Sequence, residues 1–162
     1  MSHLMLTRID FRLIHGQVMT RWVAEYQIQA IVVVDDRSAK SPILKKILLG
    51  VAPAGVEVLV YTIEDAAKLW KEDLFPAKNY MILFKNTRTA LEAHQAGIGY
   101  PALQVGGIEG SGDKKNIFKN VVMSRPEAEE LKIISDAGVT VYLQPIPEDA
   151  KYPFADAYAK FS

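Results

Sequence analysis

The sequence predicts an α/β fold: an open, mostly parallel, twisted β-sheet with helices on both faces, in three α/β/α layers. The first observation is a regular alternation of short apolar runs with segments of about ten residues at helical spacing, which is typical of β-α-β units. The second is that Ala30–Val34 is a continuous, β-branched run, as in a strand covered on both faces. Right-handed crossovers between the parallel strands follow from this topology.

The strands end where the apolar runs meet polar or turn-forming residues. In chain order we expect them at Leu4–Ile9, Ala30–Val34, Val56–Tyr61, Tyr80–Phe84, Ala102–Val105, Phe118–Met123 and Val139–Leu143. The segment Asp35–Ser38 is expected to stop the second strand. The glycine-containing segment Ile108–Lys115 is expected to be an exposed loop.

Apolar residues at helical spacing predict the helices, and capping residues mark their ends. In chain order we expect helices at Gly16–Tyr26, Pro42–Leu49, after Thr62, at Thr87–Ala96, Glu127–Ala137 and Ala155–Phe161. Two of them open with a serine followed closely by proline, in Ser41-Pro42 and in Ser124-Arg125-Pro126, an arrangement that favours a capped first turn.

The composition limits the kinds of function that the chain can have. We expect one domain over residues 1–162 and assign no function to residues 1–4, which are expected to be disordered or foreign to the domain. With 19 basic and 19 acidic residues the net charge is zero, which argues against a nucleic-acid partner and an electrostatic membrane anchor. The absence of cysteine excludes disulfides, thiolate metal sites and a cysteine nucleophile.

In parallel sheets the chemistry lies outside the carboxyl ends of the strands. This rule selects the loops Asp10–Gln17, Asp35–Ser41, Lys85–Thr87 and the segment from Gly106 onward.

The first of these loops gathers charged side chains around one histidine. His15 stands at the start of a predicted helix, where unpaired backbone N–H groups and the helix dipole favour an anion. Gly16 allows close approach of the backbone to a bound phosphate, and Arg12 and Arg8 supply positive charge that would bind it. Asp10 is placed to accept a hydrogen bond from one ring nitrogen and so to fix the tautomer. These residues indicate either a phosphohistidine or an anion-binding site.

A plainer interpretation of the same loop also stands. A single histidine near a turn is often a surface or packing residue, and Gly16 then serves only the turn. Arg8 and Asp10 would in that case form a surface ion pair worth about 0–1 kcal/mol.

The loop resembles the active-site segment of a known family, the IIB components of the mannose/fructose/sorbose sugar phosphotransferase systems (PTS). The resemblance is carried by Arg8-Ile9-Asp10-Phe11-Arg12-Leu13-Ile14-His15-Gly16-Gln17-Val18 with Trp22, and then by Val33-Val34-Asp35-Asp36, Ala39, Pro42, Lys85, Val105-Gly106, Gly138-Val139 and Gln144-Pro145-Ile146-Pro147. It therefore covers nearly the whole chain in order.

The resemblance implies a transferase, a protein-Nπ-phosphohistidine–sugar phosphotransferase that needs no cofactor or metal. His15 would accept the phosphoryl group, through Nδ1, from the IIA component and pass it to a sugar delivered by the membrane IIC and IID components. Arg12 matches the arginine that stabilises this group, and Asp10 matches an aspartate of the same loop. The implied location is cytoplasmic, peripheral to the membrane transporter, and self-association is left open.

The chain departs from the family pattern at two places. Phe11 stands where the family usually has an acidic residue, and Lys40 and Ser41 replace acid in the second loop. We expect Phe11 to be exposed and to alter partner docking, while the phosphocarrier function is retained.

The remaining candidates each have two interpretations. Gln17 either donates to the phosphoryl group or lies on the helix surface. Asp35 and Asp36 line the site or, as we favour, form turns and caps, and Lys85 adds positive potential or is simply solvated.

Three functions remain in competition. The first is the phosphocarrier with His15 as nucleophile, and the second is a non-catalytic anion-binding or regulatory domain in which His15 only contacts a ligand. The third is a phosphatase with a histidine nucleophile, which also requires an acid to protonate the leaving group.

Overall fold

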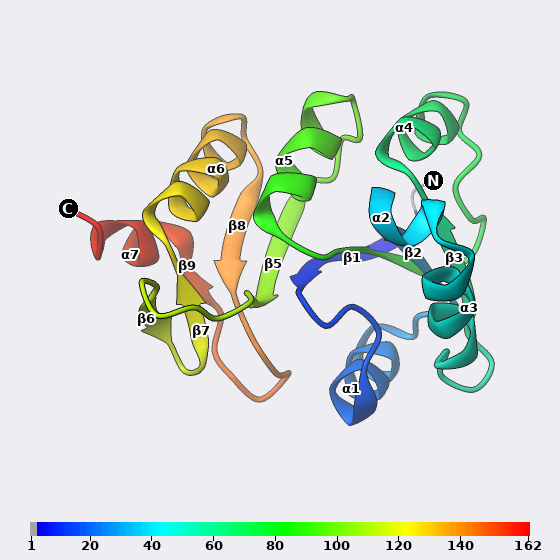
Figure 1. Ribbon diagram of the computed structural model, residues 1–162, viewed down its shortest axis with the longest axis horizontal. Coiled ribbons are helices and arrows are strands. Elements are labelled where there is room, and N and C mark those ends of the chain that lie inside the picture. The colour runs from blue at the N-terminus through cyan, green and yellow to red at the C-terminus, as the bar shows by residue number, and fades with distance from the viewer. Residues whose placement is uncertain (1–2) are drawn as a thin grey trace.

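The computed structural model describes residues 3–162, and its central element is a seven-stranded sheet (Figure 1). The strand order is β3-β2-β4-β1-β5-β8-β9. The strands are β1 (Leu4–Asp10), β2 (Ala30–Val34), β3 (Glu57–Tyr61), β4 (Tyr80–Phe84), β5 (Ala102–Gly107), β8 (Thr140–Leu143) and β9 (Tyr152–Pro153). Among the described residues of this sheet only β9 pairs antiparallel, with β8, so the predicted mostly parallel sheet is confirmed.

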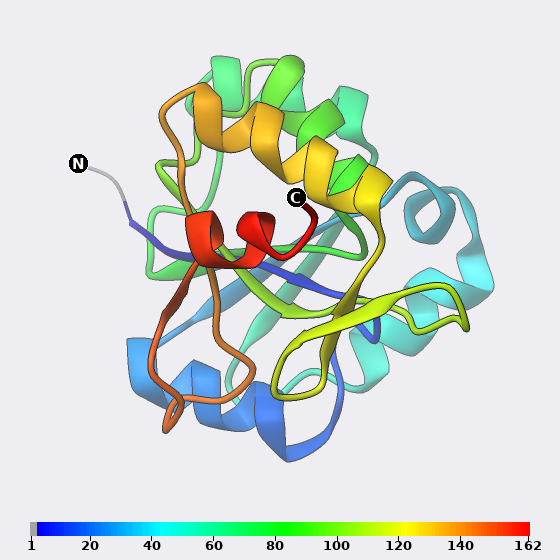
Figure 2. The same ribbon diagram turned by 90° about the vertical axis from the view of Figure 1, so that its left-hand side faces the viewer.

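Helices cover both faces of this sheet (Figures 1 and 2). They are α1 (Gly16–Tyr26), α2 (Asp36–Lys40), α3 (Pro42–Gly50), α4 (Ile63–Lys71), α5 (Thr87–Gln95), α6 (Arg125–Asp136) and α7 (Phe154–Ala159). On β2, Ile31 and Val33 pack in the cluster under α1 and α3, whereas Val32 and Val34 pack in the cluster under α4 to α7. Because strand side chains alternate between faces, a run buried on both sides produces these two cores. The three-layer α/β/α prediction is confirmed.

The structure differs from the sequence-based prediction at three short elements. The segment expected only as a stop, Asp35–Ser38, instead starts helix α2, because the Asp35 side chain accepts from the Ser38 backbone N–H and caps a helical turn. The single strand expected at Phe118–Met123 is a hairpin of β6 (Lys115–Phe118) and β7 (Val121–Met123). Lys119 has a positive φ of 55°, which reverses the chain inside the predicted strand.

The third difference is β9, which two residues form at the edge beside β8 and which is too short for periodicity to reveal. The expected loop after β5 is largely exposed, but its first residue, Ile108, is buried in the core. At the start of the chain Leu4 already belongs to β1. The expectation for residues 1–2 lies outside the described residues.

The topology opens a crevice at the end of β1. This strand lies between β4 and β5, and it leads to α1 on one face, while β4 leads to α5 and β5 leads through β6 and β7 to α6, both on the opposite face. Ligands of open parallel sheets bind where neighbouring connections diverge in this way. The loop between β1 and α1 is therefore at the position where a site is expected. Within residues 3–162, no helix is long and apolar enough to cross a membrane.

Candidate active site

The loop between β1 and α1 is folded so that it presents His15. Leu13 and Ile14 are buried and anchor the loop, and the Leu13 N–H donates to the Asp10 carbonyl at 2.9 Å. Leu13 and Gly16 both have positive φ, of 56° and 45°. These two left-handed residues turn the chain on either side of His15, whose own backbone is extended.

Asp10 is the centre of the site. Its side chain is fully buried at the carboxyl end of β1. One oxygen, Oδ2, lies 2.9 Å from His15 Nε2 and 3.2 Å from Arg8 Nη2. The other, Oδ1, accepts the Arg12 backbone N–H at 3.1 Å. Both carboxylate oxygens are thus occupied, which fixes the orientation of the group.

The contact with Asp10 determines which nitrogen of the His15 ring carries the proton. An ionised carboxylate only accepts hydrogen bonds, so His15 Nε2 carries the proton that it donates to Asp10. In the neutral ring Nδ1 then holds the lone pair and is the nucleophilic nitrogen. The side chain is 19% exposed, so the ring is held by the protein and remains reachable.

The first turn of α1 is ready for an anion. Of the helices in the described part of the chain, α2 to α6 are each capped by a side chain, whereas α1 has His15 at its N-cap and no side-chain cap. No acidic residue lies in its first turn. Uncapped N–H groups and the positive end of the helix dipole favour a phosphate-like group there.

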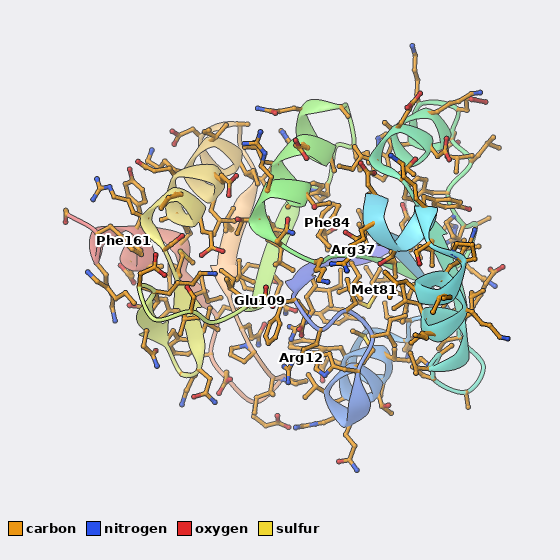
Figure 3. All side chains as sticks on the ribbon, viewed as in Figure 1. Arg12, Arg37, Met81, Phe84, Glu109 and Phe161 are labelled. Carbon is orange, nitrogen blue, oxygen red and sulfur yellow. The ribbon has the colours of Figure 1, made fainter. Side chains whose placement is uncertain are left out.

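Arg12 is the cation that is free to reach such a group. Its side chain is 50% exposed, and its Nε lies 3.5 Å from Asp10 Oδ1. The guanidinium stands 5.3 Å from the centre of the Phe11 ring, which is half-buried rather than exposed as expected. Arg12 belongs to the loop between β1 and α1, below the end of β1 in the view of Figure 3.

A groove of about 440 Å³ continues from Arg12. Its walls come from Phe11, from Ile108 after β5, from Val122 in the hairpin and from Pro145 and Ile146 after β8. The groove is therefore largely apolar and has one charged side next to the histidine loop.

The comparison with protein families agrees with this arrangement. The sequence model of the family described as "PTS system sorbose subfamily IIB component" matches residues 4–161 of the chain. The chain belongs to this family.

Relatives match this IIB component over nearly its whole length. It is 30% identical to the fructose-specific EIIB component of the PTS of Bacillus subtilis (strain 168) over 154 residues, which cover 95% of this chain and 94% of that protein. It is 29% identical to the mannose-specific EIIAB component of Escherichia coli (strain K12), and this match covers 96% of the chain but 48% of the longer protein.

Solved structures share the fold. The crystal structure of manxB from Thermoanaerobacter tengcongensis is 34% identical with a TM-score of 0.89, and the match covers 98% of this chain and 96% of that one. The IIBSor domain of the Klebsiella pneumoniae sorbose permease is 26% identical with a TM-score of 0.89, covering 98% of both chains. EIIB components of this kind are phosphotransferases.

Of the remaining predicted site residues of this IIB component, two lie beside His15 and three make their contacts elsewhere. Gly16 and Gln17 are exposed at the start of α1, beside His15. Asp35 and Asp36 are engaged elsewhere: Asp35 caps α2, and Asp36 Oδ1 accepts the Ile63 N–H at 2.8 Å. Both aspartates therefore cap helices, as the favoured interpretation expected. Lys85 lines a second, more polar pocket with Glu109 and Glu130, and this pocket adjoins the groove through Phe11 and Ile108.

Arg8 requires a correction. It was expected to form either a direct phosphate contact or a surface ion pair, but its side chain is fully buried beside Asp10. No part of the guanidinium reaches the surface at which a phosphoryl group would arrive. Its contacts lie inside the protein, with Gln104 and the backbone that follows β8.

Sequence reasoning did not predict the hydrogen bonds that the buried residues behind the site make with one another. Gln104 and Gln144 are both buried, and Gln104 Nε2 donates to Gln144 Oε1 at 3.2 Å. Trp22 is also buried, with Nε1 donating to the Pro145 carbonyl at 3.3 Å. One signal was present: a glutamine inside the apolar run Ala102–Val105 must find polar partners, because buried amides are almost always hydrogen-bonded.

Within residues 3–162 no three His, Cys, Asp or Glu side chains come together as a set that could hold a metal ion. The positive charge at the site comes from Arg12 and from the N–H groups of α1.

Proposed function

We propose that this IIB component is a phosphohistidine carrier that accepts the phosphoryl group on His15 Nδ1 and passes it to a sugar. The donor in this proposal is a phosphohistidine of the IIA component, and the sugar is delivered by the membrane components IIC and IID. The observation that carries the proposal is the 2.9 Å contact between His15 Nε2 and Asp10 Oδ2. It leaves Nδ1 as the nucleophile at the uncapped start of α1.

In the first step the Nδ1 lone pair forms the new N–P bond while the N–P bond of the donor histidine breaks, and its electron pair returns to the donor ring. The His15 ring becomes positively charged, with the Nε2 proton directed at the Asp10 carboxylate. The carboxylate stabilises this charge in the way that an aspartate stabilises imidazolium in hydrolytic triads. Arg12 and the first N–H groups of α1 bind the phosphoryl oxygens.

In the second step a sugar hydroxyl attacks phosphorus and releases its proton to solvent, while the N–P electron pair returns to Nδ1. The neutral ring is regenerated with its proton still on Nε2, facing Asp10. The protein needs no proton transfer through Asp10 in either direction. Its work is therefore positioning and charge stabilisation, as in other phosphoryl transfers.

The partners follow from the family and from the names of relatives. The Escherichia coli mannose relative is named an EIIAB component, and this chain matches about half of it, which supports a IIA protein as the donor. Relatives are named for fructose, sorbose and N-acetylgalactosamine, so the sugar is left unassigned. We place the protein in the cytoplasm, peripheral to the membrane transporter that would supply the sugar.

The test is incubation with the phosphorylated general components and the IIA component, followed by mass spectrometry. We expect an adduct of about 80 Da on His15 that is stable to alkali and labile to acid. His15→Ala should abolish the adduct, whereas His94→Ala, which alters a ring stacked edge-on against Tyr100, should retain it. An adduct that persists in His15→Ala would contradict the proposal, and a wild-type protein without an adduct would contradict it and favour an anion-binding domain. Hydrolysis of free phosphate esters without partners would indicate a phosphatase.

A further inference from the structure

Arg8 is a fully buried cation in the middle of the sheet. A buried charge is costly unless it is paired and fully hydrogen-bonded. Burial lowers the pKa of the Arg8 guanidinium, while the neighbouring Asp10 carboxylate opposes this change. Arginine nevertheless stays protonated in proteins, so the positive charge is permanent.

All four hydrogens on the terminal nitrogens of Arg8 are used inside the protein, whereas the fifth donor, Nε, has no hydrogen-bond partner among the described residues. Nη1 donates to Gln104 Oε1 at 2.5 Å and to the Gln144 carbonyl at 3.0 Å. Nη2 donates to Asp10 Oδ2 at 3.2 Å and to the Pro145 carbonyl at 3.0 Å. Four donors with four acceptors leave no terminal N–H group for a phosphoryl oxygen.

The surroundings of Arg8 hold its guanidinium in one place. The Trp22 ring lies 5.2 Å from Cζ and covers one side of the group. A Cβ atom at Gly106 would lie 2.0 Å from the same Cζ, so only glycine fits there. Gln104 is oriented because its Nε2 donates to Gln144 Oε1, which turns its own oxygen toward Arg8.

Asp10 Oδ2 is shared between Arg8 and His15, and this connects the buried cation to the reactive ring. The guanidinium supplies the opposite charge beside the Asp10 carboxylate and holds Oδ2 in position to accept from Nε2. Without it, the buried carboxylate would lose its paired charge and its firm orientation, and the Nε2–H tautomer would no longer be enforced.

We propose that Arg8 is a positioning residue that fixes the tautomer of His15 through Asp10, supported by Gln104 and by the space at Gly106. The catalytic consequence rests on the proposed phosphocarrier function. The same guanidinium binds the carbonyls of Gln144 and Pro145. Pro145 lines the groove beside Arg12. By binding its carbonyl, Arg8 also fixes the position of this wall of the groove relative to the histidine loop.

The test reads the tautomer of neutral, unphosphorylated His15 from the ¹⁵N chemical shifts of its ring nitrogens. Wild type should show the Nε2–H form. Arg8→Met should give a mixture of both forms, and Arg8→Lys should give an intermediate result, because lysine keeps the charge but lacks the planar fork. The matched control is Thr7→Val on the same strand, whose buried hydroxyl has no hydrogen-bond partner among the described residues.

Transfer from the phosphorylated IIA component provides a second measurement. The maximal rate for Arg8→Lys should fall about tenfold to a hundredfold, as for other residues that orient a reactive ligand, with little change in KM. If Arg8→Met does not fold, Arg8→Lys decides the question. An unchanged Nε2–H tautomer in a folded Arg8 variant would overturn the proposal. Because the tautomer is read without phosphate, a wild-type protein that accepts no phosphoryl group would refute the proposed function and leave this result standing.

Discussion

The first backbone N–H groups of a helix have no partner within the helix, and α1 and α6 differ in whether side chains bind them. At α6, Ser124 accepts the Glu127 N–H, and the Glu127 side chain accepts the Ser124 N–H, so a complete capping box closes the helix. At α1 the N-cap is His15, no side chain caps the first turn, and two residues of the loop have positive φ.

The difference shows that the start of α1 is locally less stable than the start of α6. A capping box is worth about 1 kcal/mol, and each left-handed residue costs about that much or more unless it is glycine. At α1 the cost of positive φ falls on Leu13, Gly16 adopts its positive φ without a Cβ penalty, and the N–H groups of the first turn stay available. Strain and missing caps of this kind are concentrated at functional sites.

Among the changes that compare the two helix starts, we expect the largest effect at Arg12, the exposed cation at the uncapped helix. Arg12→Ala should lower the rate of phosphoryl transfer roughly ten- to a hundredfold, because a charge-assisted contact of about 1.5–3 kcal/mol is lost. Single-turnover transfer from the phosphorylated IIA component measures it. Arg125→Ala is the control, since Arg125 stands at the first position of the capped helix and donates to the Phe161 carbonyl. Equal rates in the two variants would contradict the assignment.

Gly16→Ala tests the strained turn. Nothing lies within 4 Å of a Cβ at this position, so the cost comes from φ alone and should be about 1–2 kcal/mol of unfolding free energy. The control is Gly50→Ala in α3, where a Cβ also meets nothing and φ is not positive. There we expect a gain of about 0.5–1 kcal/mol. Urea denaturation compares the two, and equal stabilities would show that the turn is not strained.

Ser124→Ala removes the cap of the other helix. We expect a loss of about 1 kcal/mol in unfolding free energy and no change in the transfer rate. Ser135→Ala, in the last turn of α6, is the matched control for stability. A slower transfer in Ser124→Ala would mean that the two helix starts are not independent.

Gln17→Glu places a carboxylate in the first turn of α1 with almost no change of shape. The helix dipole should stabilise the unphosphorylated protein by about 0.3–1 kcal/mol. The same charge should slow acceptance of the phosphoryl group, because the two negative groups compete for the N–H donors. Thermal denaturation and the transfer rate measure these effects, and a variant that gains both stability and rate would contradict the account of an anion site.

The sequence predicted most of the fold because long elements carry strong periodic signals. The five-residue runs of β2 and β4 and the capped helices such as α6 lie where they were expected. The helix α2, the turn at Lys119 and the two-residue β9 were missed, because single side-chain contacts or dihedral angles decide elements of this size.

For the site, the sequence located the loop and its chemistry but not the depth of each residue. Arg8 and Arg12 are the same residue type, but Arg8 lies within β1, opposite Gln104 of β5, and is buried, whereas Arg12 lies in the loop beyond the end of β1 and is half exposed. The partners of Arg8 come from Gln104 and Gln144, far along the chain, so tertiary packing determines its role.

The most direct test of the central claim is the identity of the phosphorylated nitrogen. After phosphorylation by the IIA component, ³¹P and ¹⁵N NMR of His15 report which ring nitrogen is bonded to phosphorus. Because Asp10 holds Nε2, we predict the phosphoryl group on Nδ1, with the Nε2 proton still directed at the carboxylate. A phosphoryl group on Nε2 would contradict the account, since that nitrogen would have to leave Asp10 to react.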